Sequence, residues 1–147
     1  MRIEDEIKLT FDDVLIRPKR STLVSRSEVV LERKFKFKHT NEIWTGVPIF
    51  SANMDTTGTF ETAITLQKHK MLTAIHKFYS IKDWEKNVEK LDPNFISVTV
   101  GQSKEDLQLG QKIFSLNSDI KYLCIDVANG YRDCLLYTSP SPRDNRT

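Results

Sequence analysis

Residues 95–100, Phe95-Ile96-Ser97-Val98-Thr99-Val100, form a short and largely apolar run that Gly101 closes. Similar runs occupy residues 47–54, 71–76 and 122–128, and they lack the clean alternation of a half-exposed strand. Strands that are buried on both faces of a parallel sheet have this composition. The four runs therefore predict four buried parallel strands.

Helical patterns separate these runs, at residues 59–70, from Ser80 onward, and from Ser103 to about Leu116. Ser80 is predicted to be an N-cap because Asp83 follows at the spacing of a capping box. Strand-then-helix units that repeat every ~25 residues indicate an α/β fold with a parallel sheet. Either an open doubly wound sheet or part of a barrel fits this order, although no Gly-x-Gly-x-x-Gly motif follows any strand.

The N-terminal segment lies outside this repeat, as a cap or lid would. Pro18 breaks its first apolar stretch because proline fixes φ and lacks an N–H group. Residues 33–38 alternate basic residues with Phe35 and Phe37, which predicts a strand with one exposed face. Residues 43–44 are the expected partner strand, and the two phenylalanines the packed face of the hairpin.

The last residues, 132–147, have no helical or strand period, and two Ser-Pro steps oppose a regular element. The stretch also resembles the translated read-through of a sequencing adapter. We therefore predict that residues 1–131 are the N-terminal part of the fold and that residues 132–147 are a non-native, disordered tail. A native disordered terminus is the alternative.

Composition excludes several classes of protein. The chain has 147 residues and a net charge of +2, which does not indicate a nucleic-acid-binding protein. No run of ~18 apolar residues predicts a membrane helix, and the N-terminus lacks a secretory signal. We expect a cytoplasmic location, no disulfide framework and no metal site, with Cys124 a buried small hydrophobe.

Polar residues follow three of the predicted strands, where parallel α/β folds place their functional groups. Lys77 and Asp126 are the strongest candidates, because a lysine at the end of a barrel strand can bind a phosphate or carry a proton, and a nearby carboxylate tunes its pKa. A structural ion pair is the alternative. Asn53 could bind a ligand or only cap the helix that follows. Met54 could lie against a flat base or in the core. A histidine in the position of His76 is more often structural than catalytic.

A basic stretch near the N-terminus contains Arg17, Arg20 and Arg26 among serines such as Ser25. Guanidinium groups suit phosphate geometry, so a ribose phosphate is one target. A solvated basic loop explains the same pattern equally well.

Five motifs stand in order along residues 1–131. They are Leu9-Thr10-Phe11-Asp12-Asp13-Val14-Leu15, Arg17-Pro18-Lys19-Arg20-Ser21-Thr22-Leu23 followed by Ser25-Arg26-Ser27-Glu28-Val29, Ala52-Asn53-Met54-Asp55-Thr56 with Gly58-Thr59-Phe60, Thr73-Ala74-Ile75-His76-Lys77 and Asp126-Val127-Ala128-Asn129-Gly130-Tyr131. Together they resemble the IMP dehydrogenase/GMP reductase family, and its GMP reductase branch in particular. IMP dehydrogenase is the near alternative, but it usually carries inserted regulatory modules for which this chain has no room after the second strand.

The resemblance implies a (β/α)8 TIM barrel, here truncated to about four β/α units plus an N-terminal cap or hairpin, in a homotetramer. It implies NADPH-dependent reductive deamination of GMP to IMP and ammonia. Six residues would bind NADPH: Lys77, Asp126, Val127 and Ala128 on one side, and Ser25 and Arg26 contributed by a neighbouring subunit. Lys77 and Asp126 would also relay a proton to the departing ammonia, and Asn53 and Met54 would lie at the nucleotide.

The chain departs from the family pattern at Phe78, which replaces a usual His, at Ser51, which replaces Ala, and at Thr57, which replaces Val. In the family, a nucleophilic cysteine and a potassium-linked loop come later, and neither Cys124 nor Cys134 matches the nucleophile's motif. We therefore expect the chain by itself to be inactive. A non-enzymatic nucleotide-binding half-barrel is the competing expectation.

Overall fold

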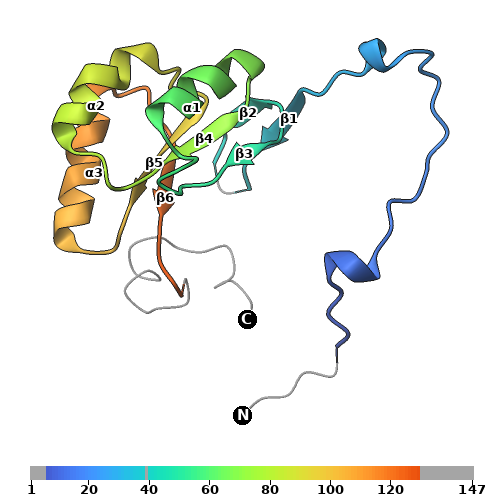
Figure 1. Ribbon diagram of the computed structural model, residues 1–147, viewed down its shortest axis with the longest axis horizontal. Coiled ribbons are helices and arrows are strands. Elements are labelled where there is room, and N and C mark those ends of the chain that lie inside the picture. Colours follow the sequence, from blue (N-terminus) through green and yellow to red (C-terminus); the bar gives the residue numbers. More distant parts are fainter. Residues whose placement is uncertain (1–5, 39, 130–147) are drawn as a thin grey trace. The chain divides into compact units, whose positions relative to one another are not determined.

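The computed structural model describes residues 6–38 and 40–129, and its largest element is a parallel sheet (Figure 1). The strands are β3 (Phe50–Ser51), β4 (Leu72–Ile75), β5 (Ile96–Val100) and β6 (Leu123–Ile125), in the spatial order β3-β4-β5-β6. Each strand therefore pairs with the one before it in the sequence. This order is that of a (β/α)8 barrel, whereas a doubly wound sheet reverses its strand order partway across.

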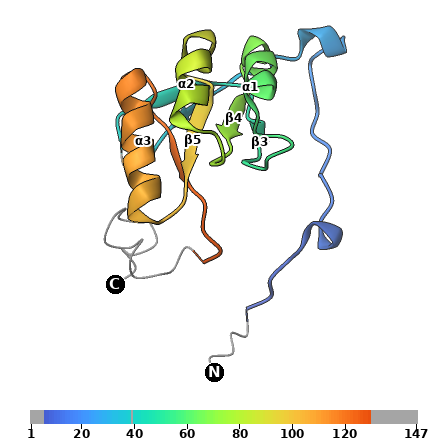
Figure 2. The same ribbon diagram turned by 60° about the vertical axis from the view of Figure 1, so that its left-hand side comes forward.

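Three helices connect these strands: α1 (Phe60–Leu66), α2 (Ile81–Asn87) and α3 (Lys104–Leu116). Figures 1 and 2 show them side by side on one face of the sheet. One apolar core lies between the two layers, in which Ile75 and Val98 from the strands meet Phe60, Trp84 and Ile113 from the helices. All five residues of β5 are buried, as the composition of its run predicted.

The helix starts follow the predicted capping residues. Ser80 caps α2 and Ser103 caps α3, each in a capping box with an aspartate three residues later. The helix predicted over residues 59–70 is shorter, because α1 ends at Leu66 and the 3₁₀ turn η3 (Gln67–His69) follows. Lys70 then adopts a left-handed conformation with φ of 56°, which ends the helical path.

Two predicted strands are shorter than their apolar runs. The run at residues 47–54 contributes only two residues to β3, since Pro48 has no N–H group and the N–H of Ile49 bonds to the Val47 carbonyl at 2.7 Å. The run at residues 122–128 contributes three residues, so Asp126 follows β6 directly.

The predicted hairpin is present as β1 (Arg33–Lys36) and β2 (Ile43–Gly46), which pair antiparallel. Trp44 is its anchor: the side chain is buried, and its Nε1 donates a hydrogen bond to the Asn94 carbonyl at 2.9 Å. Phe35 packs on Trp44 and Phe37 on Tyr122, with ring centroids 5.9 and 5.8 Å apart. Both phenylalanines stay about 40% exposed, so the packed face is only partly covered.

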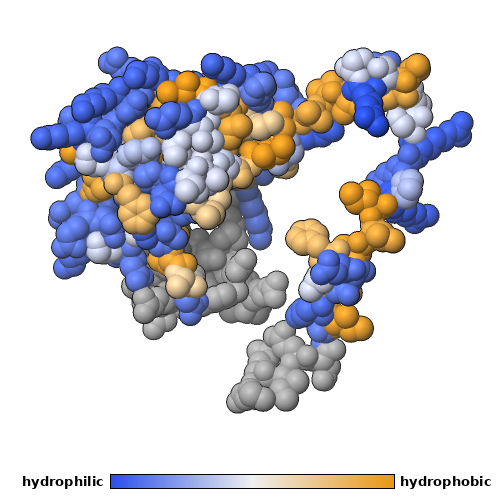
Figure 3. Space-filling view, in the orientation of Figure 1, coloured by the Kyte–Doolittle hydropathy of each residue, from blue (hydrophilic) through white to orange (hydrophobic). Residues whose placement is uncertain are grey.

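The chain up to Val30 forms a compact unit of its own. Its regular elements among the described residues are two 3₁₀ turns, η1 (Phe11–Asp13) and η2 (Arg26–Glu28). Every residue from Glu6 to Val30 is exposed, and apolar side chains alternate with charged ones along the segment (Figure 3). The predicted tail and its boundary at residue 131 lie outside the described residues.

Candidate functional site

Lys77 and Asp126 meet at the carboxyl ends of the strands. Lys77 follows β4 and Asp126 follows β6, so the lysine side chain reaches past the end of the intervening β5. Its Nζ lies 3.0 Å from the Asp126 Oδ2, and the side chains are 32% and 41% exposed. The N–H of Asp126 bonds to the Val100 carbonyl at 2.8 Å, which fixes the aspartate to the end of β5. The prediction that the two residues lie together is therefore confirmed.

The Lys77 ammonium also faces an aromatic ring. Its Nζ lies 5.8 Å from the centroid of Phe78, a side chain that is 72% exposed. An ammonium at this distance is attracted by the electron-rich face of the ring. The substitution that departs from the family pattern thus leaves Lys77 with two contacts, one ionic and one aromatic, and a surface open to solvent.

His76 is held as a structural residue. It is buried, its ring stacks on Tyr79 at 4.0 Å, and its Nδ1 accepts the N–H of Phe78 at 3.2 Å. Tyr79 in turn stacks on Phe60, which meets Trp84 edge-on. This row of rings joins the loop after β4 to the core and so fixes the backbone on which Lys77 stands. The sequence does not predict this row of rings, although it contains the aromatic residues Phe60, Tyr79 and Trp84.

Asn53 and Met54 lie in the loop between β3 and α1. The Met54 side chain is 58% exposed, so it is not part of the core. The Met54 carbonyl accepts the N–H groups of Thr57 and Gly58, and the Gly58 carbonyl accepts the N–H of His76 at 2.9 Å. The loop is therefore tied to the end of β4, one residue before Lys77. This places both loops on the same rim of the sheet.

Ser25 and Arg26 lie in the N-terminal unit. Both are exposed, and Ser25 caps η2 in a capping box with Glu28. Val127 and Ala128 continue the chain after Asp126, the first half-buried and the second exposed. The predicted cofactor-binding roles of these four residues remain predictions.

Cys124 is a free thiol that is half-buried, less enclosed than the sequence indicated. Burial raises the pKa of this thiol above its ordinary value of 9.0. A raised pKa keeps the sulfur protonated near neutral pH, and the thiolate is the nucleophilic form. The interpretation that Cys124 is not a nucleophile therefore agrees with its surroundings.

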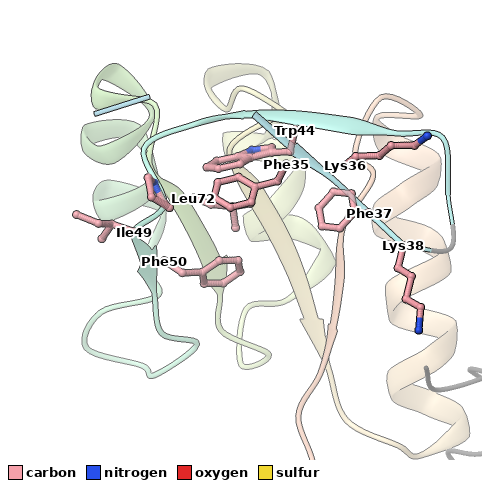
Figure 4. Close-up of a pocket in the computed structure, with 9 residues that line it drawn as sticks. Phe35, Lys36, Phe37, Lys38, Trp44, Ile49, Phe50 and Leu72 are labelled. Atoms are coloured by element: carbon pink, nitrogen blue, oxygen red, sulfur yellow. The ribbon is translucent and has the colours of Figure 1, made fainter. Parts of the chain in front are cut away.

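A cavity of about 420 Å³ lies at the other end of the strands, between the hairpin and the start of the sheet. Its apolar lining includes Phe35, Phe37, Trp44, Phe50 and Leu72 (Figure 4). The Lys36 and Lys38 ammonium groups point away from these rings. Because Lys77 and Asp126 do not line it, this cavity is separate from the charged site.

Residues 6–38 and 40–129 contain no cluster of three or more His, Cys, Asp or Glu side chains that could hold a metal ion. No helix of the same residues is long and apolar enough to cross a membrane.

Known proteins resemble this chain closely. GMP reductase from Buchnera aphidicola subsp. Acyrthosiphon pisum (strain Tuc7) is 54% identical over 136 residues, which are 90% of this chain and 39% of that protein. GMP reductase from Escherichia coli O81 (strain ED1a) is 50% identical over 136 residues, with the same coverage. The chain thus spans about two fifths of the length of these curated relatives.

A solved structure agrees with the sequence comparison. The crystal structure of inosine 5'-monophosphate dehydrogenase from Legionella pneumophila matches with a TM-score of 0.66 and 26% identity, over 88% of this chain and 38% of that one. A family model described as "IMP dehydrogenase / GMP reductase domain" matches residues 8–139. With the four sequential strands and the Lys77–Asp126 pair at their ends, these matches show that the chain belongs to the IMP dehydrogenase/GMP reductase family and forms the first part of its barrel.

Proposed function

We propose that the complete protein is an NADPH-dependent GMP reductase that converts GMP to IMP and ammonia. The observation that carries this proposal is the Lys77–Asp126 ion pair at the mouth of the sheet. It stands in a chain whose curated relatives at 54% and 50% identity are named GMP reductase. The proposal also includes a homotetramer, a cytoplasmic location and a potassium-linked loop outside this chain.

The described residues fit the NADPH that this reaction requires. Lys77 is an ammonium with three donor hydrogens, of which Asp126 occupies one direction. Since its side chain is 32% exposed, it can donate a further hydrogen bond to a ligand oxygen. Asp126, Val127 and Ala128 would line the same side, and Ser25 and Arg26 would be contributed by a neighbouring subunit of the tetramer.

When bound, NADPH supplies the hydride. The residues of this chain have other tasks. Lys77 holds a proton at Nζ, and the Asp126 carboxylate accepts a hydrogen bond from it and keeps the ammonium at the rim. The pair can deliver this proton to a leaving amine, which must depart as ammonia and not as an amide ion. Asn53 and Met54, on the neighbouring loop, would orient the nucleotide.

The test is GMP-dependent oxidation of NADPH by the complete protein produced from the full gene. Lys77→Met and Asp126→Asn should each lower kcat by about two to four orders of magnitude, the usual worth of a positioned proton donor. Lys82→Met, which removes an exposed lysine on α2, is the matched control and should leave kcat unchanged. A protein that oxidises IMP with NAD⁺ but does not reduce GMP would assign the family's other reaction.

The 147-residue chain provides a second test. We expect it to show no turnover, because its described residues supply four strands of the barrel and no cysteine with the surroundings of a nucleophile. Measurable GMP reduction by the purified chain would refute the proposal that catalysis needs residues outside it.

A further inference from the structure

Two hydroxyl groups cross-tie the loop that carries Asn53 and Met54. The Ser51 Oγ, at the start of the loop, donates to the Thr57 carbonyl near its end, at 3.1 Å. The Thr57 Oγ1 donates in the opposite direction, to the Ala52 carbonyl, also at 3.1 Å. Each side chain therefore holds the backbone at the other end of the same turn.

The backbone inside this turn is held as well. The Met54 carbonyl accepts N–H groups from Thr57 at 3.1 Å and from Gly58 at 2.7 Å. Gly58 itself lies tightly against β4, since a Cβ there would come within 2.3 Å of the Ala74 carbonyl oxygen. The end of the turn at Gly58 is thus fixed to β4, the strand that leads to Lys77. The Ser51 and Thr57 hydroxyls join the start of the turn to this fixed end.

Burial does not hold the turn in place. Residues 54–57 are exposed, and Ser51 and Asn53 are only half-buried. The simplest alternative is that the two hydroxyls only satisfy nearby carbonyls, as serine and threonine often do in loops. In an exposed loop with few apolar contacts, however, removing such ties frees the backbone, and ordering it again costs conformational entropy on binding.

We propose that Ser51 and Thr57 are paired positioning residues, which hold the Asn53–Met54 turn in the shape that receives the purine nucleotide. The inference rests on the proposed function, because that function places the nucleotide at this turn. Neither hydroxyl is expected to touch the reacting atoms. The two hydroxyls contribute to nucleotide binding. They do so jointly, because one hydrogen bond without the other does not hold the two ends of the turn together.

The experiment uses the complete protein with Ser51→Ala, Thr57→Val and both changes together. Each single change should raise the KM for GMP by about three- to tenfold, the usual effect of losing one hydrogen bond, while kcat and the melting temperature stay near wild type. The double change should raise KM little further, because the two ties close one turn. Thr57→Ser, which keeps the hydroxyl, should restore the KM.

Matched controls come from α1 and α3. Thr65 Oγ1 donates to the Glu61 carbonyl and Ser115 Oγ to the Gln111 carbonyl, both at 2.9 Å and both exposed. Thr65→Val and Ser115→Ala therefore remove the same kind of bond away from the turn, and should leave KM unchanged.

Unchanged KM values in Ser51→Ala and Thr57→Val, or an equal rise in the controls, would overturn the inference and leave the proposed function standing. Failure of Thr57→Ser to restore the KM would overturn it too. A complete protein that neither binds GMP in calorimetry nor reduces it would overturn both.

Discussion

The Lys77 side chain has two separable properties, its charge and its transferable proton. Arginine keeps the charge and the ion pair with Asp126, but it does not deprotonate in proteins. Lys77→Arg should therefore retain NADPH binding to within a few fold while kcat falls about a hundredfold or more. Fluorescence titration of NADPH alongside turnover separates the two. An arginine variant with full kcat would show that Lys77 acts only as a charge.

Cys124 gives a prediction on pH. Burial raises the pKa of its thiol, so the thiolate forms only at a higher pH than in an exposed cysteine. In a Cys134→Ser background, the rate of alkylation by iodoacetamide should reach half its maximum above pH 9.0, the ordinary pKa value. An unfolded control in denaturant should show the ordinary midpoint, and a native midpoint below it would contradict the prediction.

Among the single residues, the sequence predicted the Lys77–Asp126 pair but not the contacts that hold the neighbouring loops. Lys77 and Asp126 follow parallel strands, and such ends share one rim, so their meeting could be expected. The stack of His76 on Tyr79 and the crossed bonds of Ser51 and Thr57 depend on loop geometry. Hydrophobic periodicity carries no information on loop geometry, so Ser51 and Thr57 stood out only as unusual residues.

The cap at the start of α2 predicts how much one side chain stabilises this helix. The Ser80 hydroxyl and N–H both donate to the Asp83 carboxylate, at 2.6 and 2.9 Å. Ser80→Ala should lower the free energy of unfolding of the complete protein by about 1 kcal/mol at neutral pH, as loss of an N-cap does. Thermal or urea unfolding measures this loss, with Ser115→Ala, in the last turn of α3, as the control.

The same cap has a pH dependence of known sign. Hydrogen bonds from the Ser80 side chain and backbone hold the pKa of Asp83 below its usual 3.8. A lowered native pKa stabilises the fold above pH 3.8, and this stabilisation is lost as the pH falls through the native value. The difference between wild type and Ser80→Ala should therefore shrink in acid. A difference that stays constant below pH 3.8 would assign the effect to the helix backbone alone.

The existence of the elements was predictable, but several of their ends were not. The apolar runs and the capping serines located each strand and helix, because both signals are local. The two-residue length of β3 follows from Pro48 and the bond between Ile49 and Val47, which a run of apolar letters does not reveal. The break of α1 into η3 depends on the left-handed Lys70.

For the whole molecule, the division at Val30 predicts a pattern of proteolysis. The described residues before it are all exposed, and they include Lys19, Arg20 and Arg26 as trypsin sites. Brief trypsin treatment of the 147-residue chain should cut at these sites before it cuts in the helices, because backbone without burial is readily accessible. Mass spectrometry should find early products that begin at residues 20, 21 or 27. Early cuts at Lys68, Lys86 or Lys112 would contradict the prediction.

The choice between a barrel and a doubly wound sheet depends on the arrangement of the whole sheet. Both give buried parallel strands with intervening helices, so the pattern of apolar residues is the same. Only the spatial order of the strands distinguishes them, and that order is set by contacts between strands. The resemblance to a known family supplied what periodicity lacked.

The agreement between strand order and chain order has a consequence for synthesis on the ribosome. Each new strand finds its partner in the strand that has just emerged, so β4, β5 and β6 can join the sheet one after another as translation proceeds. The hairpin is different. Trp44 can form its hydrogen bond only after the Asn94 carbonyl, 50 residues later, has been synthesised. Glu42 can pair only after Lys121, 79 residues later, has been synthesised. The nascent sheet thus grows stepwise, while the hairpin, although it is made first, gains these two bonds only when the segments just before β5 and β6 have emerged.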